Sequence, residues 1–172
     1  VPRLVRHPDI FNTTIQTQLR NVLATQLAAF AWEPMIVGYT VGSEWDEIVT
    51  PEEIVSILAM GASVPAKKAL VDHALATLYS GSVTAMATAW KVSATTVAGL
   101  YASIPTVPSA DLEVLRRYYA DRYYAFLYET CKELDSVHLY MGNWLVPGWW
   151  VNEEDWRLVS RHCDVMGIDN YS

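Results

Sequence analysis

One carboxylate stands out because of the residues that precede it. An apolar, β-prone run over residues 35–41 is followed, after Gly42, by four residues suited to polar or stacking contacts, namely Ser43, Glu44, Trp45 and Asp46. A buried parallel strand reads as a continuous apolar run, and α/β barrels place catalytic groups just past the C-terminal ends of such strands. Glu44 is therefore the first candidate for acid–base chemistry. Its alternative interpretation is an exposed loop carboxylate or a partner in an ion pair.

Two further strand-like runs lead into side chains of the same kind. Residues 137–141 and 164–169 are short and apolar, and an asparagine and an aromatic residue stand after each. Because parallel strands end at one edge, the groups after the three strands are expected to form one site. Amide, hydroxyl and carboxylate side chains bond to sugar hydroxyls, and flat aromatic rings offer apolar faces for stacking. We predict a carbohydrate-binding site made of Ser43, Trp45, Asp46, Asn143, Trp144, Asn170 and Tyr171. The alternative is that the tryptophans cover the rim of the core.

Helical patterns separate these strands. Apolar residues recur at steps of three and four over residues 13–31 and from 109 to about 134, which indicates two long helices. Thr50, Pro51 and Glu53 form the signature of a helix start, with a cap, a proline at the first position and a glutamate three residues after the cap. The remaining helices are expected at residues 51–60, 65–79, 82–101 (one or two short helices) and after the cap Asn152.

The alternation of helices and strands predicts an α/β fold with a parallel sheet. The glycines of the first strand do not form a GxGxxG or GKS/T motif, which disfavours a nucleotide-binding open sheet. We therefore expect part of a (β/α)8 TIM barrel, with a helical insertion at residues 47–108 after its first strand. The chain of 172 residues would be a fragment of one such domain, since its last expected strand has no helix after it.

Composition narrows the choice of partners. The chain is 52% apolar with a net charge of -7, and its 12 Lys and Arg residues never cluster beyond adjacent pairs. A protein that binds nucleic acid needs a basic surface for the phosphates, so nucleic acid is not an expected partner. No run reaches the roughly 18 apolar residues of a membrane span, so no membrane partner is expected either.

The cysteines and histidines do not form a metal or redox motif. Cys131 and Cys163 make neither a disulfide framework nor a thiolate site, and we expect two buried free thiols. The four histidines are scattered without an HxxxH or HExxH pair, so no metal and no cofactor are expected. His138 is expected to be a core or rim residue, and a metal-dependent hydrolase is the least favoured of the enzyme hypotheses.

Five segments carry a more specific signal. They read PDIFN, WEPMIVGY, LYSGSVTAMATAW, HLYMG and DVMGIDNY, at Pro8–Asn12, Trp32–Tyr39, Leu78–Trp90, His138–Gly142 and Asp164–Tyr171. In this order they resemble motifs of the catalytic barrel of clan A retaining glycoside hydrolases, most closely the β-galactosidase and β-agarase type families. The resemblance extends over nearly the whole chain and assigns the visible strands as strands four to six of the barrel.

The resemblance implies a function for Glu44. In these families a glutamate at this position is the general acid/base, which protonates the glycosidic oxygen and later deprotonates water. The substrate would be a β-linked, galactose-like oligosaccharide or polysaccharide. The family's nucleophile lies at the end of strand seven, so both it and the rest of the barrel are expected outside this chain. The fragment alone is then expected to be inactive.

Ser43 departs from the family pattern. An asparagine usually precedes the acid/base glutamate and bonds to the sugar 2-hydroxyl, and a serine cannot offer an amide's donor and acceptor together. Ser43 therefore motivates a second hypothesis, a catalytically inactive barrel that serves as a carbohydrate-binding or structural module.

Overall fold

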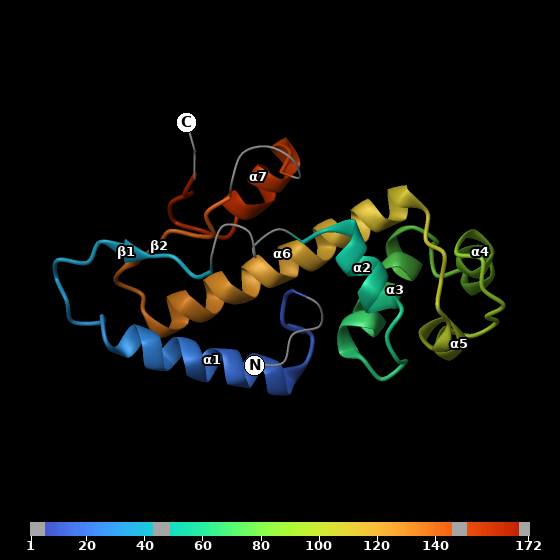
Figure 1. Ribbon diagram of the computed structural model, residues 1–172, viewed down its shortest axis with the longest axis horizontal. Coiled ribbons are helices and arrows are strands. Elements are labelled where there is room, and N and C mark those ends of the chain that lie inside the picture. Colours follow the sequence, from blue (N-terminus) through green and yellow to red (C-terminus); the bar gives the residue numbers. More distant parts are fainter. Residues whose placement is uncertain (1–5, 43–48, 146–150, 169–172) are drawn as a thin grey trace. The chain divides into compact units, whose positions relative to one another are not determined.

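The structure, a computed structural model, describes residues 6–42, 49–145 and 151–168 (Figure 1). The chain divides into two compact units. The first comprises residues 1, 13–48 and 120–172, and the second comprises residues 2–12 and 49–119. One helix, α6 (Ser109–Leu134), contributes to both units.

The first unit contains a short parallel sheet. Besides the second half of α6, this unit contains α1 (Thr13–Ala28), β1 (Gly38–Tyr39), β2 (Leu139–Tyr140) and α7 (Glu153–Ser160). Gly38 pairs with Leu139 and Tyr39 pairs with Tyr140, so β1 and β2 run in the same direction. This arrangement confirms the predicted parallel pairing of the first two strands. Exposed Arg20 of α1 forms an ion pair of 2.7 Å with Glu133 of α6.

The strands are shorter than the apolar runs that predicted them. Within the described residues β1 has one strand partner, β2, and the side chains of Met35 and Val37 are 85% and 72% exposed. A strand is held by the hydrogen bonds of its neighbours, so a run with a single neighbour forms only a short ladder.

The third predicted strand begins irregularly. The backbone N–H groups of Asp164 and Val165 both donate to the carbonyl oxygen of Tyr140, and further on Leu145 and Ile168 form an isolated parallel bridge. Residues 164–168 are the described part of the predicted strand, and within them this bridge is the strand-like element. Its parallel direction agrees with the prediction, although a continuous strand does not form there.

The second unit is helical. It contains α2 (Pro51–Leu58), α3 (Pro65–Thr77), α4 (Val83–Ala89), α5 (Val97–Ala102) and the first half of α6. The stretch predicted to hold one or two short helices forms two, because each has its own capping hydroxyl. Ser82 accepts a hydrogen bond from the N–H of Ala85, and Thr96 accepts one from the N–H of Gly99.

The predicted helix caps are confirmed. The Thr50 hydroxyl accepts from the N–H of Glu53, and Asn152 forms a capping box with Asp155. The carboxylate of Glu53 has a further role, because it contacts Nδ1 of buried His7 at 2.9 and 3.0 Å. Burial acts to raise the pKa of Glu53, but the hydrogen bond and charge of His7 outweigh it, and the pKa lies below its usual value.

Both cysteines are free thiols, as expected, but the prediction that both are buried was wrong for Cys163. Cys131 is buried in α6, whereas Cys163 is half-buried. Burial, together with the negative charge of Asp135, raises the pKa of the Cys131 thiol to about 12. In the described part of the chain, no helix is both long enough and apolar enough to cross a bilayer.

Candidate active site

Asn143 connects the ends of the two paired strands. Its Nδ2 atom donates to the carbonyl oxygen of Val41 at 2.9 Å, and its Oδ1 atom accepts from the hydroxyl of Tyr140 at 3.2 Å. The residue is only 2% exposed. Asn143 was predicted to bind sugar, and the structure adds a second use of its amide. It fixes the backbone where the chain leaves β1, three residues before Glu44.

Trp144 faces the next segment along the sheet. The residue is 41% exposed, and one edge of the indole lies against the backbone of Gly167. A Cβ atom placed on Gly167 would come within 2.4 Å of Cδ1 and 2.5 Å of Nε1 of this ring. The following residue, Leu145, is buried and bridges Ile168. The indole therefore combines a packed edge with an accessible surface, as a stacking platform requires.

Consecutive residues thus connect three chain segments. Asn143 contacts the exit of β1, and Trp144 contacts Gly167 of the third segment. These are the segments predicted to supply one common site, and the site itself stays a prediction. The other predicted site residues, Ser43, Glu44, Trp45, Asp46, Asn170 and Tyr171, lie outside the described residues and follow directly in sequence.

An aromatic cluster supports this region from within. The rings of Tyr39 and Tyr140 meet edge to face with centroids 6.2 Å apart, and Tyr128 of α6 lies 5.9 Å from Tyr140. Burial raises the pKa of Tyr39 well above its ordinary value, and the thiol of Cys131 adds to the shift. The Tyr39 phenol is therefore neutral at any physiological pH, and it serves as packing.

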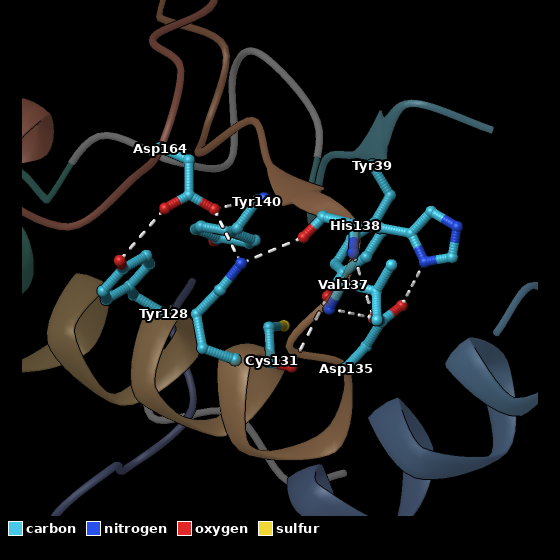
Figure 2. A network of polar contacts seen from close by, with 9 residues as sticks. Tyr39, Tyr128, Cys131, Asp135, Val137, His138, Tyr140 and Asp164 are labelled. Atoms are coloured by element: carbon cyan, nitrogen blue, oxygen red, sulfur yellow. Dashed lines mark hydrogen bonds and ion pairs between the residues drawn. The ribbon is translucent and has the colours of Figure 1, made fainter.

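Asp164 organises a polar network around β2 (Figure 2). Its carboxylate accepts hydrogen bonds from the backbone N–H of Tyr140 at 2.9 Å, from Nζ of Lys132 at 2.9 Å and from the hydroxyl of Tyr128 at 3.1 Å. The bond from Tyr140, followed by that from Lys132, lowers the pKa of Asp164. The carboxylate takes the place that a neighbouring strand's carbonyl would occupy, so it anchors the third segment to β2.

A second pair in the same network lies in the short connection between α6 and β2. Nδ1 of His138 lies 2.7 Å from Oδ2 of Asp135, and the backbone N–H groups of Val137 and His138 donate to Oδ1 at 3.0 and 3.1 Å (Figure 2). Burial acts to raise the pKa of Asp135, but these bonds outweigh it and the pKa is lowered. Lys132 also donates to the carbonyl of His138 at 3.0 Å.

The polar side chains of this network precede β2 in the chain (Lys132, Asp135, His138) or begin the third segment (Asp164), whereas Asn143 follows the C-terminal end of β2. In α/β folds groups at the N-terminal ends of strands serve stability, whereas the opposite ends carry chemistry. His138 was predicted to be a core or rim residue, and it is buried. The roles of Asp135 and Asp164 were missed. Asp135 carries a known local signal, an aspartate two residues before a turn amide, whereas Asp164 bonds to a residue 24 positions away. The described residues contain no group of three or more His, Cys, Asp and Glu side chains placed to hold a metal ion.

Comparison with known proteins gives structural neighbours only. No protein-family model matches the chain, and no curated protein matches it either. Among solved structures, it is similar to an exo-β-agarase (TM-score 0.80, 18% identity), covering 96% of this chain and 24% of that one. It is also similar to the agarase AgWH50C (TM-score 0.79, 20% identity) and to PfGH50B (TM-score 0.80, 17% identity), covering 96% of this chain and 25% of each of theirs.

These neighbours establish the fold. The chain has an agarase-like fold, which confirms that part of the resemblance seen in the sequence motifs. It spans about a quarter of the length of the structures it matches.

Proposed function

We propose that the protein is a retaining glycoside hydrolase that cleaves β-glycosidic bonds in a galactose-containing polysaccharide of the agarose type. The observation that carries the proposal is the agarase-like fold, combined with a buried amide, Asn143, that fixes the strand exit leading to Glu44. The parallel pairing of β1 with β2 supports the further proposal that the chain forms strands four to six of a (β/α)8 barrel, with residues 47–108 inserted after strand four.

Glu44 is the proposed general acid/base. It would protonate the glycosidic oxygen as the bond breaks and then deprotonate the water that releases the sugar. A retaining mechanism needs a second carboxylate roughly 5–5.5 Å away as the nucleophile. We assign that nucleophile to the end of strand seven, in residues outside this chain, which would also supply the rest of the barrel.

The sugar would be held by residues after all three strands. The exposed face of Trp144 offers a stacking surface, and Trp45 and Tyr171 would add to it. Polar contacts would come from Ser43, Asp46, Asn143 and Asn170. Asn143 already uses amide groups within the protein, so its main contribution is to hold the site together.

The test is a substitution of Glu44 in the full-length protein. General acid/base catalysis is worth about 10²–10⁴ in rate, so Glu44→Gln should lower kcat/KM on agarose oligosaccharides by about that factor. An aryl β-galactoside with a good leaving group needs no protonation, and its kcat/KM should change little. Glu47→Gln, three residues later, is the matched control. Unchanged hydrolysis of agarose oligosaccharides by Glu44→Gln would refute the assignment.

A second candidate function is carbohydrate binding without catalysis. Ser43 favours it, because this residue stands where the related hydrolases use an asparagine. On this alternative the full-length protein binds agarose oligosaccharides with equal affinity with or without Glu44 and releases no sugar. The strand-seven segment would also lack a glutamate.

A further inference from the structure

We propose that Gly167 is a positioning residue that sets the orientation of the Trp144 indole and thereby the affinity of one sugar-binding position. The inference rests on the proposed function, because it takes Trp144 as a stacking surface for a hexopyranose ring. It adds a residue that was not among the predicted site residues.

The contact between the two residues depends on the missing side chain of Gly167. A Cβ atom there would lie 2.4 Å from Cδ1, 2.5 Å from Nε1 and 2.9 Å from Cε2 of Trp144. Carbon and nitrogen atoms in contact are normally separated by about 3.5–4.0 Å. The indole can therefore occupy its present place only because residue 167 is a glycine.

The backbone does not require glycine for another reason. The φ angle of Gly167 lies outside the left-handed region that favours this residue. An alanine at position 167 could adopt the same backbone conformation, so its methyl group would conflict with the indole alone. The rigid five-membered ring cannot bend away, and the whole side chain would have to rotate.

The backbone on both sides of Trp144 is already fixed. Asn143 donates to the carbonyl of Val41, and Leu145 is buried and bridges Ile168. Because the backbone on both sides is held, the main motion left to Trp144 is rotation of its side chain. Gly167 restricts that rotation by receiving the edge of the ring.

A fixed ring matters for sugar recognition. Stacking on a pyranose requires the aromatic plane to be parallel to the apolar face of the sugar, and a ring ordered before binding loses less conformational entropy. An indole displaced from Gly167 would no longer hold its plane parallel to the apolar face of the sugar. The expected result of Gly167→Ala is therefore weaker binding in a folded protein.

The experiment is a double-mutant cycle in the full-length protein. Binding of an agarose-derived tetrasaccharide is measured by calorimetry for Trp144→Ala, Gly167→Ala and the double variant. We expect Trp144→Ala to raise Kd by about tenfold and Gly167→Ala to raise it by about fivefold. The double variant should match Trp144→Ala, because residues that act through one another are not additive. Gly61→Ala is the control, since a Cβ atom there meets nothing within 4 Å, and it should leave Kd unchanged.

Fluorescence separates a displaced ring from general damage. Gly167→Ala should shift tryptophan emission to longer wavelength as the indole becomes more exposed, and the shift should vanish in a Trp144→Phe background. If Gly167→Ala alone fails to fold, its combination with Trp144→Ala should fold, because the ring that the added Cβ atom meets is then absent.

Two results would overturn the inference. One is wild-type affinity in folded Gly167→Ala, and the other is an equal loss of affinity from Gly167→Ala with and without Trp144. If Trp144→Ala binds the tetrasaccharide normally, Trp144 has no stacking role, and the inference about Gly167 is refuted as well. In that case a loss of hydrolysis in Glu44→Gln would still support the proposed function, so the two failures are distinguishable.

Discussion

Asn143 donates a hydrogen bond of 2.9 Å from Nδ2 to the carbonyl oxygen of Val41, so a side chain that follows β2 holds the backbone that follows β1. The same amide accepts from the hydroxyl of Tyr140 at 3.2 Å. The bond joins segments 102 residues apart in sequence. It transmits the placement of β2 to the chain that carries the proposed acid/base.

Removal of this bond should impair catalysis through the geometry of Glu44. We expect Asn143→Ala to lower kcat of the full-length protein by about tenfold or more, because misplacement of a catalytic group by about 1 Å can cost as much as 10²-fold. Poor leaving groups should suffer more than good ones, since only they need protonation. Folding stability should fall by about 1–3 kcal/mol, because the carbonyl of Val41 loses a buried partner. Asn21→Ala, at an exposed helix position, is the control, and equal losses for both kinds of leaving group would contradict the positioning role.

The Asp164 carboxylate should make stability dependent on pH. Its folded pKa is lowered from the usual 3.8 by the Tyr140 N–H and by Lys132. A depressed folded pKa gives a contribution that is fully present above the unfolded pKa and is lost as pH falls through the folded pKa. Asp164→Asn should therefore destabilise the protein at pH 7, by about 1 kcal/mol or less because Asp164 is exposed to solvent, with a smaller difference at pH 3. Urea denaturation at both pH values measures this, and a difference that does not shrink in acid would count against the assignment.

Asp135 and His138 should matter for stability and leave the chemistry unchanged. Both side chains are buried and lie 2.7 Å apart, and removal of one partner from a buried pair typically costs about 3–5 kcal/mol. We expect His138→Ala to lower the melting temperature while kcat per folded molecule stays at the wild-type value. A strong fall in kcat for the fraction that remains folded would instead place His138 in the active site.

The thiol of Cys131 should be unreactive in the folded protein. Its pKa is raised to about 12 by burial, and the thiolate is the reactive form. At pH 8, iodoacetamide should modify Cys131 only after unfolding, whereas half-buried Cys163 should react first. Mass spectrometry of tryptic peptides over time distinguishes the two, and equal rates for both cysteines would contradict this expectation.

Local features of the fold could be predicted from the sequence because their causes are local. Thr50 and Asn152 cap the helices that follow them, as their positions indicated. Partners distant in sequence could not be predicted. The Glu53 side chain pairs with His7, 46 residues away, although its spacing from Thr50 indicated only a capping role.

In the candidate site, too, the position of a residue could be predicted but its distant partner could not. The position of Asn143 after an apolar run predicted a residue at the strand ends, and it is found there. Its bond to Val41 depends on which strand lies beside β2, which no local pattern reveals. The roles of Glu44 and of the residues next to it stay predictions.

The exposed side chains of Met35 and Val37 have a consequence for handling this chain. They precede β1 in the chain, and within the described residues β1 has one strand partner, β2, so its other edge can pair with another extended segment. Such an edge is a template for aggregation. Prepared alone, the 172 residues are expected to form soluble oligomers or precipitate as concentration rises. A charge at this edge, as in Val37→Lys, should delay that, so the choice of expressed boundaries and buffer will govern the yield of any isolated preparation.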